Sequence, residues 1–210
     1  VADDVQVPAW QNTPPQDPEL IKMLEDEYFS SGYDLRSMLR VLFNSDSFKN
    51  ARFAKVKSPT EVVIGTMRLV EDFKTPKLGL HALASNIRYM GQDLMNPPTV
   101  EGWHTGREWI DSGTLVERIN FAADQVGNTS LPGVRAIVDR LSSEGIDTPD
   151  QLVRRCLDML GAYELPEETY TQLIDHVQKG GTLQPGTNNY SERVAQILQL
   201  IVSTQEYQFA

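Results

Sequence analysis

The sequence predicts an all-α protein: a globular bundle of about eight or nine helices, with an extended N-terminal arm and one long loop rich in proline, glycine and tryptophan. Apolar residues recur at helical spacing from residue 17 onward, and capping residues, prolines and glycines separate the helical stretches. No stretch shows the alternating pattern of a half-buried strand. The 210 residues, 40% of them hydrophobic, are enough to bury a core without disulfides or a structural metal.

The first part of the chain is expected to be an arm followed by two helices. Residues 1–16 contain three prolines and no periodicity, so we expect an extended arm whose Trp10 could contact another surface. Asp17 and Pro18 are a capping residue and a proline at the first helical position. Asp34 begins the next helix, whose apolar stripe predicts one buried face. That stripe is Leu35, Met38, Leu39 and Leu42.

Further helices follow to the end of the chain. Residues 58–61 form a capping box, and residues 148–151 repeat its pattern. Pro166 begins a later helix, and glycines end several of the others. The apolar stripes of these helices span residues 63–70, 80–87, 115–126, 134–141, 152–160, 173–177 and 194–201.

The succession of helices predicts three segments. The arm takes up residues 1–16, and a helical region takes up residues 17–126. A second helical region at residues 127–210 is expected to pack on the first. A length of 210 residues fits one continuous domain.

Composition argues against several classes of function. The formal net charge of −10 argues against binding to nucleic acid or to an anionic membrane, because both require clustered basic side chains. No stretch approaches 18 apolar residues, so we expect no membrane-spanning segment. Cys156 is the only cysteine and has apolar neighbours, so we expect it to be buried rather than reactive. Without strands there is no phosphate-binding loop of the nucleotide-binding folds, and we expect no cofactor.

One stretch, residues 91–113, is neither helix nor strand by its sequence. Its proline pair and its glycines interrupt regular structure, yet it carries the large apolar residues Leu94, Met95, Val100, Trp103, Trp109 and Ile110. We expect the loop to be plugged into the helical body, with each indole N–H bonded to an acceptor. The alternative is a binding groove framed by the two tryptophans. The candidate binding residues are Gln92, Asn96, Pro97, Pro98, Glu101, Trp103, Arg107 and Trp109, with Trp10 of the arm as a separate contact.

The same loop offers one arrangement that could hold a metal. Glu101, His104 and Glu108 would lie on one side if the loop were helical there, and such a cluster could bind a divalent ion. Gly102 and Gly106 oppose that helix. We therefore expect no metal site.

The loop and the helix before it resemble a known family. The runs SPTEVVIGTMRLV at residues 58–70 and GQDLMNPPTVEGWHTGREWIDSGTLVERINFA at residues 91–122 are similar to the C-terminal signature of the bacterial domain-of-unknown-function family 1800. The resemblance is close over residues 17–126 and loose beyond them. The chain departs from the family pattern within the loop, at Met95, Thr99, Glu101 and residues 104–105.

The resemblance implies that this chain is the C-terminal part of a larger, exported helical protein. It implies an extracytoplasmic location, either periplasmic or secreted, and no particular activity. Members are often encoded beside a second uncharacterised family related to sulfatases and phosphatases, which suggests a protein partner.

Two hypotheses for the function follow. The first is a non-catalytic helical interaction or scaffold subunit that docks on another protein or a multi-subunit complex, with the extrinsic face of a membrane complex as one option. The second is a hydrolase-like enzyme whose active site is completed by a missing N-terminal half. It predicts a cleft lined by Gln92, Asn96, Glu101 and Arg107 together with residues from elsewhere.

Overall fold

The regular secondary structure of the described residues is helical. This computed structural model describes residues 11–51, 53–75, 77–103, 105–161 and 163–209, so Trp10 lies outside the described residues. Within them are ten α-helices and the short 3-10 helices η2 and η3, and an isolated bridge pairs Thr99 with Gly102. The all-α prediction is confirmed, with ten α-helices in the described residues against the eight or nine expected.

Contacts divide the chain into two compact units. Unit 1 ends at Val56, and unit 2 spans Lys57–Phe209. The hydrophobic pattern carries no signal of this boundary, because helical stripes continue on both sides of it. The expected segments 17–126 and 127–210 stay predictions.

Unit 1 is a helical hairpin with a short third helix. α1 (Pro18–Ser30) begins where the Asp17 carboxylate accepts a hydrogen bond from the Leu20 amide at 2.9 Å. α2 (Leu35–Asn44) begins where the Asp34 carboxylate accepts one from the Arg36 amide at 3.0 Å. Both predicted caps are confirmed. α3 (Asp46–Asn50) follows directly and has no counterpart in the predicted stripes.

The predicted buried face of α2 is wrong. Leu35 is 59% exposed and Leu39 is 41% exposed, and no residue of α2 is buried. Among the described residues of unit 1, only Leu20 and Val56 are buried. The reason is that three short helices make a single layer, and an apolar stripe needs a second layer to cover it.

Unit 2 contains seven α-helices in the described residues. They are α4 (Pro59–Leu69), α5 (Leu80–Tyr89), α6 (Ser112–Gly127), α7 (Pro132–Ser143), α8 (Pro149–Leu160), α9 (Glu167–Lys179) and α10 (Asn188–Val202). η2 (Gly106–Trp109) precedes α6, and η3 (Glu206–Gln208) follows α10. The capping box at residues 58–61 is confirmed, whereas the side chain of Thr148 accepts no capping hydrogen bond at the start of α8.

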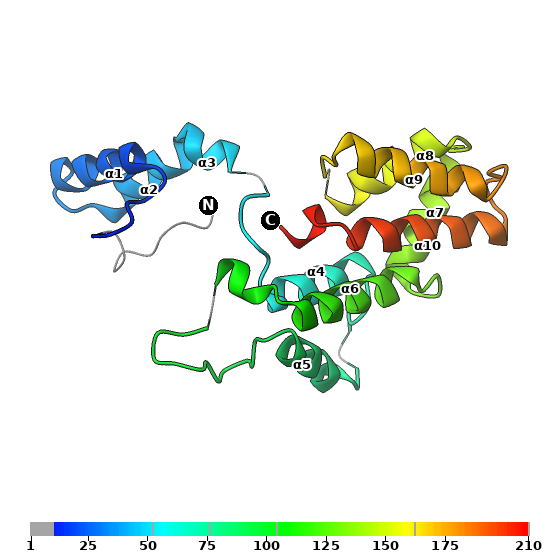
Figure 1. Cartoon of the computed structure of the whole chain (residues 1–210), viewed down its shortest axis with the longest axis horizontal. Helices are drawn as coiled ribbons and strands as arrows, with labels where there is room; N and C mark the ends of the chain where they lie inside the picture. The colour runs from blue at the N-terminus through cyan, green and yellow to red at the C-terminus, as the bar shows by residue number, and fades with distance from the viewer. Residues whose placement is uncertain (1–10, 52, 76, 104, 162, 210) are drawn as a thin grey trace. The chain divides into compact units, whose positions relative to one another are not determined.

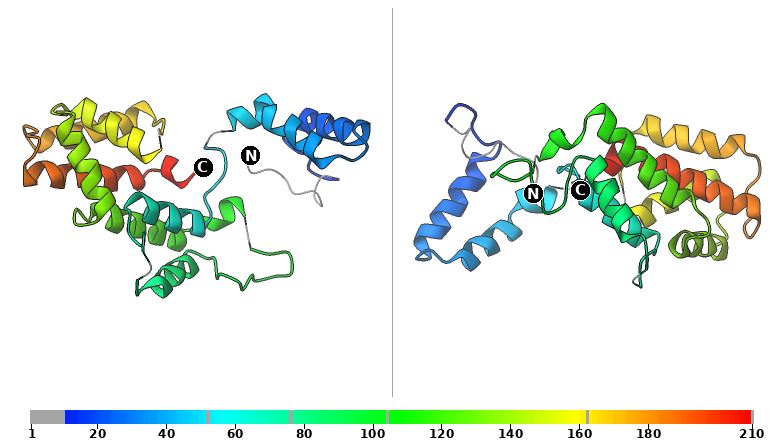
Figure 2. Two further views of the ribbon diagram at one scale, coloured as in Figure 1. Left: turned by 180° about the vertical axis from the view of Figure 1, so that it is seen from behind. Right: turned by 90° about the horizontal axis from the view of Figure 1, so that it is seen from below.

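α10 is the central helix of unit 2. It lies between the α8–α9 pair and the α4–α6 pair in Figure 1, and it stays beside α6 in both views of Figure 2. Its predicted stripe is buried, and the buried Tyr190 hydroxyl donates a hydrogen bond to the Ile146 carbonyl at 2.9 Å. Cys156 is buried in the same core, as expected, and burial raises the pKa of its thiol to about 12.

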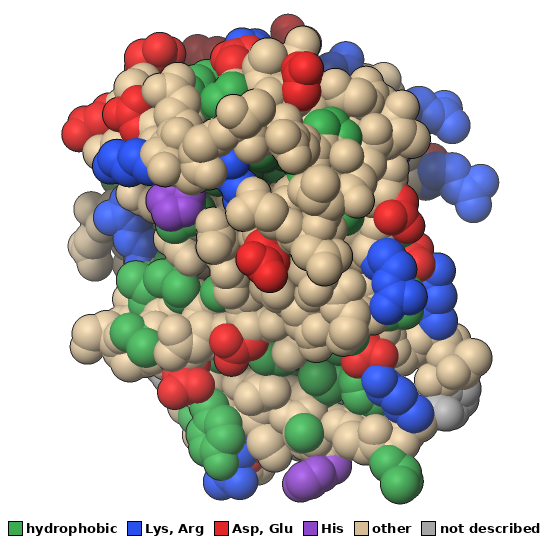
Figure 3. All heavy atoms as spheres, turned by 90° about the vertical axis from the view of Figure 1, so that its right-hand side faces the viewer, with side chains coloured by type: hydrophobic (Ala, Val, Ile, Leu, Met, Phe, Trp, Pro, Cys, Tyr) green, Lys and Arg blue, Asp and Glu red, His purple; other side chains and the backbone are tan. Residues whose placement is uncertain are grey.

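The outer surface of unit 2 carries charges of both signs. On the face that Figure 3 shows, Lys and Arg side chains are interspersed with Asp and Glu side chains. Exposed ion pairs along single helices include Arg140 with Glu144 at 3.0 Å and Arg154 with Asp150 at 3.2 Å. Such pairs are worth little individually, so the stability of unit 2 comes mainly from its apolar core.

Candidate functional site

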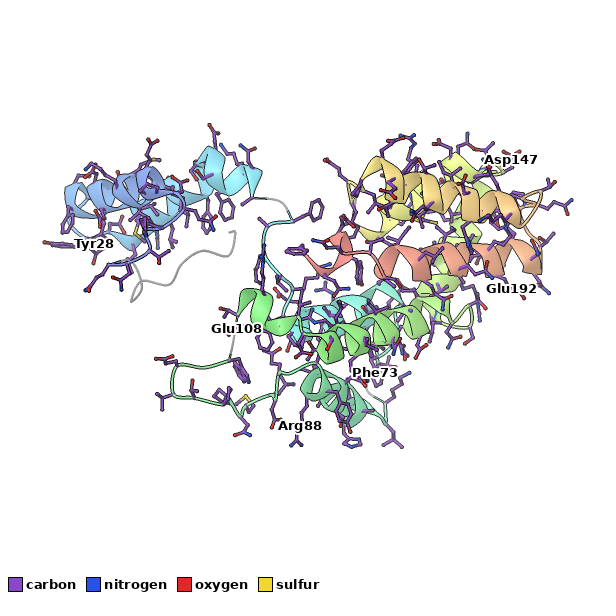
Figure 4. The ribbon with its side chains drawn as sticks, in the orientation of Figure 1. Tyr28, Phe73, Arg88, Glu108, Asp147 and Glu192 are labelled. Carbon is purple, nitrogen blue, oxygen red and sulfur yellow. The ribbon has the colours of Figure 1, made fainter. Side chains whose placement is uncertain are left out.

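The loop between α5 and η2 holds most of the predicted binding residues. Figure 4 labels Arg88 in α5 and Glu108 in η2, the elements at the two ends of this loop. The prediction that the loop is plugged into the helical body is wrong for its tip, where Met95 is 93% exposed and Val100 is fully exposed. Trp109 is buried at 6% exposure, whereas Trp103 is only half-buried.

The loop is held by its own polar groups rather than by apolar packing. The backbone N–H of Asn96 donates to the Asp93 carbonyl at 3.1 Å. The indole Nε1–H of Trp103 donates to the same carbonyl at 3.0 Å, so the acceptor expected for this indole is confirmed. Pro97 and Pro98 stiffen the loop segment between these contacts. The loop can therefore turn back in solvent without burying its apolar side chains.

The predicted binding residues do not converge on one site. The Gln92 Oε1 accepts hydrogen bonds from the backbone N–H and the hydroxyl of Thr60, at 3.0 and 2.7 Å, and so helps to cap α4. The Asn96 Nδ2 donates to Asp93 Oδ2 at 3.1 Å within the loop. Among the predicted loop residues, Asn96, Pro97, Pro98 and Glu101 are exposed. The cleft expected for a hydrolase also needs residues from elsewhere, so it stays a prediction.

Arg107 is the predicted residue that does line a cavity. The cavity has a volume of about 590 Å³ and lies between η2, α6 and residues 203–209. None of the other predicted loop residues lines it. Trp10 and His104 lie outside the described residues, and the described residues hold no group of three His, Cys, Asp or Glu side chains placed to bind a metal ion.

Sequence reasoning missed a polar cluster of unit 2, formed by Lys57, Thr66, Arg118, Tyr163 and Tyr207. Lys57 Nζ donates to the Tyr163 hydroxyl at 2.6 Å and to the Tyr207 carbonyl at 2.7 Å. It also lies 4.3 Å from the ring centroid of Tyr207, a cation–π distance. The hydroxyls of Tyr207 and Thr66 share a hydrogen bond of 3.1 Å. The cluster thus connects α4, the segment after α8 and the C-terminal segment.

Arg118 is a fully buried charged member of this cluster. Its side chain has no exposed surface, and Nη2 donates to the Lys57 carbonyl at 2.8 Å. Its Nε and Nη1 have no hydrogen-bond partner among the described residues. Buried donors without partners cost free energy, so Arg118 is a weak point in the packing of unit 2.

Burial governs the protonation of the cluster. It lowers the pKa of Lys57 from 10.5 to about 8, an effect that Arg118 reinforces and Glu61 opposes. Burial likewise lowers the pKa of Arg118 to about 10 and raises that of Tyr163 to about 12. The Lys57 ammonium contacts Tyr163 and Tyr207, which come from two other segments of unit 2, so we interpret the cluster as structural.

The lowered pKa of Lys57 predicts that the stability of the folded chain depends on pH. With a pKa of about 8 in the folded state and 10.5 as its ordinary value, Lys57 binds more protons when unfolded between those pH values. The cost of its buried charge is therefore fully present below pH 8 and disappears as the pH approaches 10.5. Relative to Lys57→Met, the unmodified chain should gain stability across this window, as measured by urea unfolding at several pH values.

The control for this experiment is Lys179→Met, which removes an exposed lysine from the end of α9. Its stability difference from the unmodified chain should stay constant over the same pH range. If the stability difference between Lys57→Met and the unmodified chain is equally constant, or changes with pH in the opposite direction, the lowered pKa of Lys57 is contradicted.

Comparison with family models gives one match. Residues 10–209 match the model of a family described as "Protein of unknown function (DUF1800)". The match confirms the resemblance seen in the loop and extends it over the C-terminal helices. Comparison with curated proteins and with solved structures finds no match. Among the described residues, no helix is both long enough and apolar enough to cross a membrane.

Proposed function

We propose, on the premise that this chain belongs to the DUF1800 family of proteins of unknown function, that it is a non-catalytic docking subunit. In this proposal it is the C-terminal portion of a larger, extracytoplasmic protein. Its helical hairpin binds an amphipathic helix of another protein, which can belong to a multi-subunit complex. The observation that carries the proposal is the set of exposed large apolar side chains on unit 1.

These side chains, which we together call the hairpin face, belong to α1, α2 and the turn between them. Its members are Met23, Phe29, Tyr33, Leu35, Leu39 and Phe43, each between 41% and 65% exposed. Scattered apolar residues are normal on a protein surface, but six on one small hairpin are not. Unit 1 buries too little of its own apolar surface to explain why they are there.

Ring contacts with Tyr28 hold two members of the hairpin face, Phe29 and Tyr33, in place. The rings of Tyr28, Phe29 and Tyr33 pack edge to face, with centroids 5.2 to 5.9 Å apart. Gly32 and Tyr33 both adopt a φ of 72°, a left-handed turn that brings the third ring back against α1. Aromatic anchors held in place before binding are the residues that contribute most to protein interfaces. The trio therefore supports a protein as the partner.

Charge supports a basic partner. α1 carries four acidic side chains, Glu19, Glu25, Asp26 and Glu27, against one basic side chain, Lys22, which already pairs with Asp26 at 3.0 Å. A groove of about 610 Å³ along this helix has Met23 and Val41 among its lining residues and three of the carboxylates at its side. An amphipathic helix with lysine or arginine beside its apolar residues matches both features.

The proposal is tested with a short amphipathic helical peptide that carries lysines beside its leucines, and with a copy in which glutamates replace the lysines. We expect the basic peptide to bind the chain at least about tenfold more tightly, because the α1 carboxylates attract it. Leu35→Ser should weaken this binding by about tenfold through lost apolar contact. Isothermal titration calorimetry measures both effects.

The matched control is Val116→Ser, because Val116 is 53% exposed on α6 of unit 2. It should leave peptide binding unchanged. Leu35→Ser should also change the free energy of unfolding by no more than about 0.5 kcal/mol, as surface substitutions do. Equal binding of the two peptides, or a Leu35→Ser chain that is strongly destabilised, would count against a docking face.

A further inference from the structure

We propose that the cavity between η2, α6 and residues 203–209 binds a small amphipathic carboxylate. The ligand has an apolar body, one negative charge and one N–H donor. The cavity belongs entirely to unit 2. The inference is therefore independent of the hairpin face, and either can fail without the other.

The cavity has the size and the apolar wall of a ligand site. Its volume of about 590 Å³ lies within the range of about 300 to 1,000 Å³ that is typical of small-molecule sites. Leu115 and Ile119, one helical turn apart on α6, line it together with Ile110 and Phe209. All four side chains are half-buried rather than covered by the core. They offer a surface for an aliphatic group of the ligand.

One charged side chain lines the cavity. Arg107 is exposed, and among the described residues its guanidinium has no ion pair or hydrogen bond. No carboxylate lines the cavity. A planar guanidinium with five donors matches the two oxygens of a carboxylate. The negative charge of the ligand is assigned to this position.

A buried amide supplies the second polar requirement. Gln208 lines the cavity but is only 2% exposed, and its Oε1 has no hydrogen-bond partner among the described residues. Its backbone is fixed, because its carbonyl accepts from the Lys57 amide at 2.9 Å and its amide donates to the Gln205 carbonyl at 2.9 Å. A buried acceptor without a donor costs free energy, so a ligand that brings an N–H relieves that cost.

The hydroxyls at the cavity point to the same requirement. Ser203 Oγ donates to the Gln199 carbonyl at 2.7 Å, and Thr204 Oγ1 donates to the Ile201 carbonyl at 2.8 Å. Their protons are thus already used, and each oxygen has only acceptor capacity to offer. The two hydroxyls and the Gln208 Oε1 therefore favour a donor on the ligand.

Two sources share this chemistry: a free N-acyl amino acid, and the last residue of a peptide chain with an apolar side chain. Both join an aliphatic group, a carboxylate and an amide N–H. The probes that represent them are N-acetylleucine and a hexapeptide that ends in leucine with a free carboxylate. Two further probes each lack one feature: N-acetylleucinamide lacks the charge, and N-acetyl-N-methylleucine lacks the N–H.

The test is calorimetric or NMR titration of the full 210-residue chain with these probes. We expect saturable binding of N-acetylleucine, and at least tenfold weaker binding of the amide and of the N-methyl compound. Arg107→Gln changes an exposed side chain and should not affect folding. It should weaken the binding of N-acetylleucine to the level measured for N-acetylleucinamide. Arg135→Gln, which removes an exposed arginine of α7, is the matched control and should change nothing.

The outcomes are distinct. A hexapeptide that binds more than tenfold more tightly than N-acetylleucine identifies a peptide terminus as the source, and equal binding identifies a small molecule. Absence of saturable binding of both free-carboxylate probes up to about 10 mM would overturn the proposal. So would equal affinity for acid and amide, or an Arg107→Gln chain that binds as the unmodified chain does.

Discussion

Trp109→Ala is expected to lower the free energy of unfolding by about 3 to 5 kcal/mol, the usual cost of removing a buried tryptophan. Trp109 is 6% exposed, and its carbonyl accepts a hydrogen bond from the Thr114 hydroxyl at 3.0 Å at the start of α6. The same change at Trp103 should cost less than about 2 kcal/mol, because that ring is half-buried and its main polar contact is one hydrogen bond, to Asp93.

Urea unfolding of the two variants measures this difference. The comparison is matched, because the same side chain is removed from two places that are close in sequence. Equal costs for the two variants would mean that the loop packs as tightly as η2 does. That result would support the sequence-based prediction that the loop is packed into the helical body.

Gly133→Ala is expected to destabilise the chain by at least about 3 kcal/mol, since it forces an added carbon into backbone atoms that cannot move aside. A Cβ at this position would lie 2.6 Å from the Val70 carbonyl carbon and closer still to the Leu69 carbonyl oxygen. The Gly133 amide also donates to the Val70 carbonyl at 2.8 Å. The start of α7 is therefore packed directly on the end of α4.

Gly65→Ala is the control for that experiment. Gly65 lies inside α4 with nothing within 4 Å of its would-be Cβ. Alanine there should raise the free energy of unfolding by about 0.5 to 1 kcal/mol, because it favours the helix. Thermal melts of both variants, followed by circular dichroism, should show that Gly133→Ala lowers the melting temperature and Gly65→Ala raises it. A Gly133→Ala chain as stable as the unmodified one would contradict the close approach of the two helices.

Local signals predicted the helices well. Asp17, Asp34 and Ser58 all cap helices where the sequence places them, because a cap involves only residues near one another in the chain. The stripe of α10 is buried as predicted, because a fully packed central helix shows its contacts in its own periodicity.

Predictions about what covers a face were less successful. The stripe of α2 has the right spacing for burial, but spacing does not reveal whether a second layer exists. The buried residues of α6 are Arg118, Phe121, Ala122 and Val126, so the side of this helix that faces the core includes a charged residue. The same helical spacing could have identified Arg118 if its charge had not removed it from the apolar pattern.

The candidate site was only partly predictable for a related reason. The loop drew attention because of its tryptophans, yet the cavity takes Arg107 from η2 and joins it to residues more than 90 positions later in the chain. Contacts over such distances depend on the packing of α6 against α10. A single sequence does not encode them as a pattern.

The central claim is that the hairpin face binds a helix of another protein, and site-specific photo-crosslinking tests it most directly. A photoreactive amino acid replaces Leu39 in the full-length protein in its own cells, and the crosslinked peptides are identified by mass spectrometry. The account predicts crosslinks to an amphipathic segment of a different polypeptide with lysine or arginine beside its apolar residues, and their loss in Leu35→Ser. Crosslinks confined to the protein's own chain or to a second copy of it, or crosslinks unaffected by Leu35→Ser, would contradict it.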